Sequence, residues 1–134
     1  MRQIILASHG NMAKGMVDTI EMISGKHDNL NAFSMSKKET PDYIYSSIKN
    51  TIESFDKEDE VFIFSDIAGG SVNTEAMKFI KYSNVHLISG MNLPIVINCL
   101  LSEENDVNYL LSEGRNSLNE IKYTKYNESD MWEE

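Results

Sequence analysis

The sequence predicts an α/β fold: a three-layer, doubly wound and mostly parallel central sheet with helices on both faces. Short apolar runs alternate along the chain with longer segments whose apolar residues recur at helical spacing. Loops rich in Gly, Asn and Asp follow several of the apolar runs. A chain of 134 residues fits one domain. We expect that domain over residues 1–126, followed by an acidic, disordered tail over 127–134.

The first half of the chain contains two strand–helix pairs. Residues 4–7 form an apolar run typical of a strand buried on both faces. A helix follows, and Gly25 is placed to end it. Its apolar stripe consists of Met12, Met16, Ile20 and Ile23, with Ala13 and Val17 alongside. Residues 30–35 are a weaker strand candidate. A second helix begins near Thr40 with proline in its first turn, and its stripe consists of Ile44, Ile48, Ile52 and Phe55.

The second half continues the alternation. Residues 61–64 form the clearest strand, and the next helix begins at Ser71 and is marked by Val72, Ala76 and Ile80. A fourth strand covers residues 85–89. Pro94 lies near the start of a short helix through Leu101, and a last helix is predicted over 107–121. Residues 121–126 are a candidate antiparallel edge strand at the carboxyl end of the domain.

Composition excludes several classes of function. The net charge is −9, so nucleic acid is an unsuitable partner because phosphate contacts need a basic surface. The amino-terminal residues lack the pattern of a signal peptide, no stretch reaches the length of a membrane span, and the single cysteine, Cys99, fits a reducing compartment. We therefore expect a cytoplasmic protein without a disulfide, in which Cys99 is a small apolar core residue.

Residue types that support phosphoryl chemistry follow the first and third predicted strands. If these strands are neighbours, His9 and Asp66 emerge side by side. A carboxylate that accepts a hydrogen bond from Nδ1–H fixes the imidazole tautomer and leaves Nε2 with its lone pair. It also stabilises the positive charge that develops when the ring acts as a nucleophile. We therefore predict His9 as a nucleophile oriented by Asp66.

A phosphate cradle is predicted directly after Asp66. Gly69 and Gly70 allow backbone N–H groups to approach a phosphate closely, and Ser71 opens a helix. The Ser71 hydroxyl could cap that helix or donate to a phosphate oxygen, and the sequence leaves both uses open. Candidate residues at the rim of the site are Gly10, Asn11 and Asn92, although Asn92 also suits a turn before a helix.

Three blocks of sequence resemble the enzyme IIA component of the mannose-type (mannose/fructose/sorbose) sugar phosphotransferase system. The blocks cover residues 4–10, 64–71 and 88–94, with Ala13 and Gly15 near the first. The resemblance implies that His9 accepts a phosphoryl group at Nε2 from the phosphocarrier HPr and passes it to a IIB component, and that membrane IIC and IID subunits are reached indirectly. It further implies a homodimer with an exchanged carboxy-terminal strand. No metal or organic cofactor is implied.

The chain departs from the family pattern at two positions. Asn11 stands where the family often has an aromatic residue or glycine, and Val72 stands where it has proline. Neither change removes a group that the chemistry needs, and the transported sugar stays undefined. Two other readings remain open: the phosphotransfer subunit of a dihydroxyacetone kinase system, and a non-enzymatic regulatory or binding module of the same fold.

Overall fold

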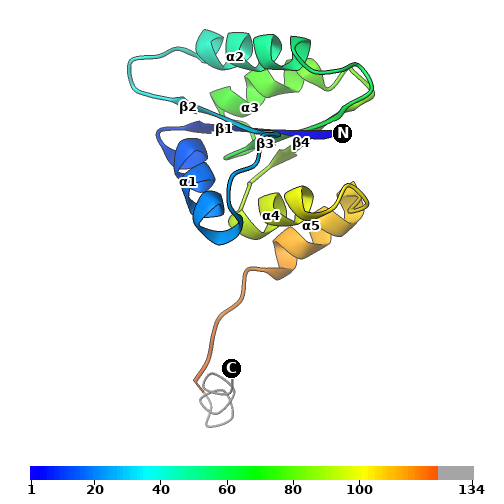
Figure 1. Ribbon diagram of the computed structural model, residues 1–134. Coiled ribbons are helices and arrows are strands. Elements are labelled where there is room, and N and C mark those ends of the chain that lie inside the picture. Colours follow the sequence, from blue (N-terminus) through cyan, green and yellow to red (C-terminus); the bar gives the residue numbers. More distant parts are fainter. Residues whose placement is uncertain (124–134) are drawn as a thin grey trace.

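The structure is a computed structural model that describes residues 1–123. A single sheet lies between two layers of helices, α2 and α3 on one face and α1, α4 and α5 on the other (Figure 1). The strands are β1 (Arg2–His9), β2 (Leu30–Met35), β3 (Glu60–Ser65) and β4 (Val85–Ser89). The helices are α1 (Met12–Ser24), α2 (Pro41–Glu53), α3 (Ser71–Ala76), the 3₁₀ turn η1 (Met77–Phe79), α4 (Leu93–Leu101) and α5 (Val107–Asn116).

All strand pairs in the sheet are parallel, and the strand order is β2-β1-β3-β4. From β1 the chain first moves outward to β2 and then crosses back to β3 on the other side of β1. The winding therefore reverses between β1 and β3. Ligands of such sheets bind at this reversal, outside the carboxyl ends of the strands. The predicted fold class is confirmed.

Two apolar clusters hold the layers together, and alternate strand residues supply each of them. Ile4, Leu6, Phe62 and Phe64 pack with α1, α4 and α5. Ile5 and Ile63 point the other way and pack against α2 and α3. Both sets are fully buried, which explains why β1 and β3 are apolar without interruption.

Several predicted elements need correction. On α1 the buried residues are Ala13 and Ile20, whereas Met12 is 44% exposed and Ile23 is 58% exposed, so the predicted stripe is rotated around the helix. The α3 helix ends at Ala76 and tightens into η1 before Ile80. The last helix is shorter than expected and ends at Asn116.

The predicted carboxy-terminal strand is not formed in the described residues. Residues 121–123 lack strand structure, and 124–126 lie outside the part of the chain that the structure describes. The predicted acidic tail over 127–134 also lies outside it. No helix within residues 1–123 combines the length and apolar character needed to cross a lipid bilayer.

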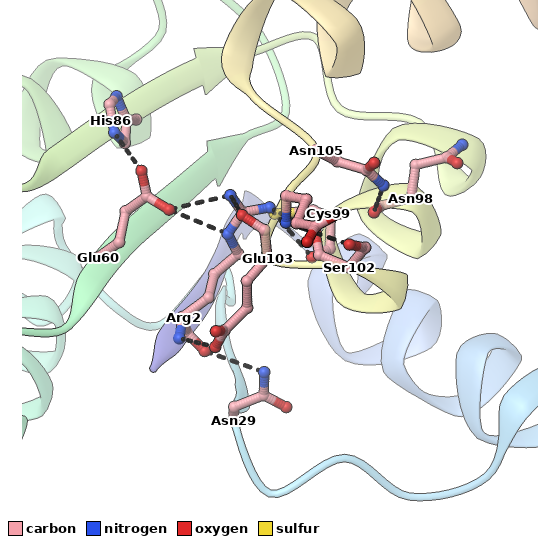
Figure 2. A network of polar contacts seen from close by, with 10 residues as sticks. Arg2, Asn29, Glu60, His86, Asn98, Cys99, Ser102, Glu103 and Asn105 are labelled. Atoms are coloured by element: carbon pink, nitrogen blue, oxygen red, sulfur yellow. Dashed lines mark hydrogen bonds and ion pairs between the residues drawn. The ribbon is translucent and has the colours of Figure 1, made fainter.

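A buried arginine joins the start of β1 to the end of α4 (Figure 2). The Arg2 guanidinium donates to Glu60 Oε1 at 2.9 and 3.1 Å and lies 4.5 Å from the centre of the Phe62 ring. It also donates to the backbone carbonyls of Ser102 at 3.1 Å and Glu103 at 2.9 Å. Carbonyls beyond a helix end lack intrahelical donors, so Arg2 satisfies groups that would otherwise be unpaired.

Two further side chains lie in this network. His86 belongs to β4; its Nε2 is 3.1 Å from Glu60 Oε2, and its ring stacks on Phe62 with centroids 4.6 Å apart. Cys99 is buried, as expected of a core residue. Burial raises the pKa of the Cys99 thiol to about 12, so the thiol stays protonated and unreactive at neutral pH.

We predict that Arg2→Ala lowers the free energy of unfolding by about 3 kcal/mol, because it removes a buried guanidinium that pairs with Glu60 and donates to the buried Cys99 carbonyl and to two partly buried ones. Arg115→Ala is the matched control, since Arg115 is the other arginine of the chain and its side chain is exposed. It should cost about 0.5 kcal/mol or less. Urea unfolding followed by circular dichroism measures both values. Equal losses would contradict a structural role for Arg2.

Candidate active site at the carboxyl ends of β1 and β3

His9 ends β1, and Asp66 directly follows β3, the neighbouring strand. Parallel pairing places Ala7 opposite Ser65, so the two side chains leave the sheet at the same edge. His9 Nδ1 lies 2.8 Å from Asp66 Oδ2, and the backbone N–H of His9 donates to the same oxygen at 2.8 Å. Two hydrogen bonds from one residue therefore fix the carboxylate against the imidazole.

The environment of Asp66 keeps its carboxyl group ionised. Partial burial acts to raise the pKa of Asp66, but the hydrogen bonds from the His9 backbone and ring, joined by one from the Ile67 N–H, outweigh it. The pKa of Asp66 is therefore lower than usual. An ionised carboxylate can only accept hydrogen bonds, so Nδ1 of His9 must carry the proton.

The other ring nitrogen of His9 points toward the loop before α3. Nε2 lies 3.3 Å from the Ser71 hydroxyl, which can donate to its lone pair. The His9 side chain is 46% exposed, whereas that of Asp66 is only 12% exposed. The nitrogen that keeps the lone pair thus lies on the accessible side of the ring, and the nitrogen that holds the proton faces the protein.

Gly70 lets the loop approach the imidazole. A Cβ atom at this position would lie 3.2 Å from His9 Cε1 and 3.1 Å from Ile67 Cγ2, closer than side chains normally pack. Gly69 has a φ of +79°, which favours glycine. The N–H groups of Gly69, Gly70 and Ser71 donate to no other group within residues 1–123. The loop that contacts the imidazole through Ser71 therefore carries three N–H donors that have no partner within the described residues.

The predicted rim residues have different surroundings. Gly10 has a φ of +57° and donates to Met35 O at 2.9 Å, so it shapes the turn out of β1. Asn11 is exposed at the start of α1. Asn92 caps α4 through a bond from Ile95 N–H and donates to Gly114 O at 2.9 Å. Asn92 is therefore committed to joining α4 to α5, which favours the structural interpretation of this residue.

Sequence reasoning missed two polar pairs that support the site. Ser8 accepts from the Ala13 N–H at 2.8 Å and so fixes α1 directly after His9. Ser65 donates to Asn73 Oδ1 at 2.5 Å in a buried contact that ties α3 to β3. Both serines interrupt an otherwise apolar strand at its carboxyl end, and that interruption is the sequence signal for them.

The surface around His9 is apolar and exposed. Ile67 is 59% exposed and Met12 is 44% exposed, one in the loop after Asp66 and the other at the first turn of α1. Within residues 1–123, no group of three or more His, Cys, Asp or Glu side chains is gathered as a metal site requires. The polar groups at this edge of the sheet instead suit a nucleophilic imidazole beside backbone donors for an anion.

Residues 3–111 match the family described as PTS system fructose IIA component. The fructose-specific EIIA component of the PTS system of Bacillus subtilis (strain 168) is 27% identical over 106 residues, which are 78% of this chain and 73% of that protein. The mannose-specific EIIAB component of Escherichia coli (strain K12) is 22% identical over 107 residues. This match covers 79% of the chain and only 33% of the relative.

Solved structures of PTS IIA proteins have the same fold as this chain. The PTS IIA protein associated with the fucose utilization operon from Streptococcus pneumoniae has a TM-score of 0.82 and 26% identity, covering 89% of this chain and 92% of that one. The mannose/sorbose-specific IIA subunit from Enterococcus faecalis also has a TM-score of 0.82, with 22% identity over 92% of this chain and 97% of that one.

We predict that neutral His9 is the Nδ1–H tautomer, because Asp66 accepts from this nitrogen. Long-range ¹H–¹⁵N correlation spectra of the neutral ring should show Nε2 as the unprotonated nitrogen. Asp66→Ala removes the acceptor and should shift the population toward Nε2–H, whereas the spectrum of His27 should stay unchanged. An unchanged tautomer at His9 in the variant would contradict the role of the carboxylate.

Proposed function

Because this chain belongs to the family of PTS system fructose IIA components, we propose that it carries a phosphoryl group on His9 between two proteins of a sugar phosphotransferase system. The match covers residues 3–111 and includes every residue of the candidate site. Membership of the family makes the chain a phosphotransferase-system component of the mannose type. The identity of the phosphorylated residue and of the two partners is the proposed part.

The observation that supports the proposal most strongly is that the two ring nitrogens of His9 have different partners. Nδ1 lies 2.8 Å from Asp66, which accepts its proton in a hydrogen bond, and Nε2 faces an exposed loop with unsatisfied N–H donors. A histidine with one fixed nitrogen and one accessible lone pair is a competent nucleophile. In a purely structural role, the unpaired N–H donors of the loop beside Nε2 would have no function, whereas in phosphoryl transfer they can bind the phosphate oxygens.

The transfer step follows from this arrangement. The Nε2 lone pair attacks the phosphorus of the donor, a new N–P bond forms, and the bond between phosphorus and the donor breaks with its electron pair returning to the donor. The ring gains positive charge, which the Nδ1–H bond to Asp66 stabilises. The hydroxyl of Ser71 and the N–H groups of Gly69 and Gly70 then donate to the phosphoryl oxygens. These donors also offset repulsion between the phosphoryl group and Asp66.

The donor in this proposal is phospho-HPr, and the acceptor is a IIB component that serves membrane IIC and IID subunits. The exposed apolar side chains of Met12 and Ile67 flank His9 and offer a contact surface to both proteins in turn. The net charge of −9 favours partners with a basic face. Donor and acceptor use the same surface because both must reach Nε2.

The proposal is tested by incubating the protein with phosphoenolpyruvate, enzyme I and HPr and following its mass. We expect an acid-labile gain of one phosphoryl group. His9→Gln should abolish the gain, and Asp66→Ala should slow it by about 100-fold or more, because the ring loses the acceptor that orients it. His27→Gln is the matched control and should be labelled at the wild-type rate, since this ring contacts Ser24 at the end of α1 and no residue of the candidate site.

Two outcomes would favour a different function. An absence of labelling on the wild type, with HPr shown to be charged, would contradict the carrier function and favour a binding module. Transfer from the labelled protein to a dihydroxyacetone kinase, with none to IIB components, would favour the other phosphotransfer system. Transfer of the label to a IIB component supports the proposal as stated.

The dimer is proposed on a separate observation, the free β4 edge of the sheet, whose other edge strand is β2. Strand β4 pairs only with β3 within the described residues, and exposed strand edges in proteins are usually covered. Leu118 and Ile121 follow α5 and are 89% and 87% exposed. In the proposed homodimer, the carboxy-terminal segment of each subunit pairs with β4 of the other and buries these side chains.

We predict that removal of residues 118–134 converts the dimer to a monomer, because it deletes the segment that pairs across the subunits. Light scattering coupled to size-exclusion chromatography should give twice the chain mass of 15.2 kDa for the whole chain and a single-chain mass for the shortened one. Removal of only residues 127–134 is the control and should leave the dimer intact. A monomeric whole chain would contradict the dimer while leaving the carrier proposal untouched.

A further inference from the structure

A cavity lies at the amino-terminal ends of β3 and β4, whereas His9 lies at the carboxyl end of β1. Its volume is about 880 Å³, within the range typical of small-molecule sites. It opens between the end of α2, the start of β3 and the η1 segment. We call it the lysine groove, and its lining residues that enter the argument are Tyr45, Lys49, Ile52, Lys57, Lys81 and Tyr82. None of the His9 site residues lines it.

Basic side chains gather at the lysine groove although the protein is acidic. Four of the twelve Lys and Arg residues line it, against the acidic residues Glu53 and Asp56. Lys49 lies 3.9 Å from Glu53, and Lys78 pairs with Glu75 at 2.5 Å. Within residues 1–123, Lys57 and Lys81 form no ion pair with a carboxylate. Two ammonium groups are thus available to an anion.

Aromatic rings lie between these cations. Tyr45 stacks on Phe79 with ring centroids 5.3 Å apart, and Lys78 Nζ is 5.1 Å from the centre of the Tyr45 ring. Lys81 Nζ lies 5.3 Å from the centre of the Tyr82 ring, and Tyr82 is 48% exposed. The exposed Tyr82 ring therefore lies beside an ammonium group in the groove, and the apolar side chain of Ile52 is also in the lining.

This combination fits one class of ligand better than others. A simple inorganic anion would use the lysines but leave the ring of Tyr82 exposed to water. A neutral aromatic compound would use the rings and leave the ammonium groups unpaired. A molecule that joins a flat ring to phosphate satisfies both, because the ring stacks on tyrosine and the phosphate oxygens accept from lysine.

We propose that the lysine groove binds a nucleotide, with its base against the ring of Tyr82 and its phosphates between Lys57 and Lys81. This site is independent of the proposed function, because it shares no residue with the site at His9. It lies on the same face of the sheet as α3, whose first residue, Ser71, contacts the imidazole.

The probe for the test is ADP, followed by titration calorimetry and by ¹H–¹⁵N spectra of the whole chain at low salt. We expect saturable shifts confined to amides that line the groove, and affinity that falls by about tenfold or more in 0.3 M salt because the contacts are ionic. Adenosine and inorganic phosphate, tested separately, should each bind more weakly than ADP.

The decisive variant is the double substitution Lys57→Glu and Lys81→Glu, which should weaken ADP binding by about tenfold or more. Its matched control is Lys37→Glu with Lys38→Glu, two exposed lysines outside the groove, which should bind ADP as the wild type does. Tyr82→Ala should also weaken ADP more than phosphate. Both double variants should accept a phosphoryl group at His9 normally, so failure here is distinguishable from failure of the carrier proposal.

Three results would overturn the proposal. The first is an absence of ADP-dependent shifts in the groove at low salt. The second is equal loss of affinity in the two double variants, which would indicate unspecific attraction. The third is that phosphate alone, or a synthetic acidic peptide of residues 124–134, occupies the groove while ADP does not.

Discussion

The parallel pairing of β1 with β3 is the constraint on which the candidate site depends. It sets Ala7 opposite Ser65, so that His9, two residues beyond Ala7, and Asp66, one residue beyond Ser65, bring Nδ1 and Oδ2 to 2.8 Å from each other. A slip of one residue in this pairing would turn the side chains of one strand to the opposite face relative to those of the other. The buried positions of Ile4, Ile5 and Leu6 therefore secure the geometry of an imidazole that lies outside the core.

The sequence predicted most of the sheet because strands buried on both faces have a distinct composition. The apolar runs of β1 and β3 are unbroken, and a Gly or an Asp follows each run. This pattern located the carboxyl edge of the sheet, where His9 and Asp66 lie. The strand of residues 30–35 also proved correct, although its apolar residues are fewer. Composition does not reveal the order of the strands in the sheet. The prediction that His9 lies beside Asp66 therefore depended on the assumption that the first and third strands are neighbours.

The features that escaped prediction depend on contacts between distant segments. Met12 fits a helical stripe in the sequence, yet it is exposed because α1 is rotated so that Ala13 and Ile20 face the sheet. Nothing in the local sequence of Arg2 reveals that its guanidinium is buried against Glu60 and the carbonyls beyond α4. The lysine groove likewise combines residues of α2, β3 and η1, whose spacing along the chain carries no signal.

The Arg2 network has a consequence for the order in which the fold can be completed. Three acceptors of Arg2 are the backbone carbonyls of Cys99, Ser102 and Glu103, about a hundred positions later in the chain. The guanidinium at the start of β1 therefore reaches its full set of partners only after the segment that follows α4 has docked. Contacts that join such distant positions cost loop-closure entropy and slow folding.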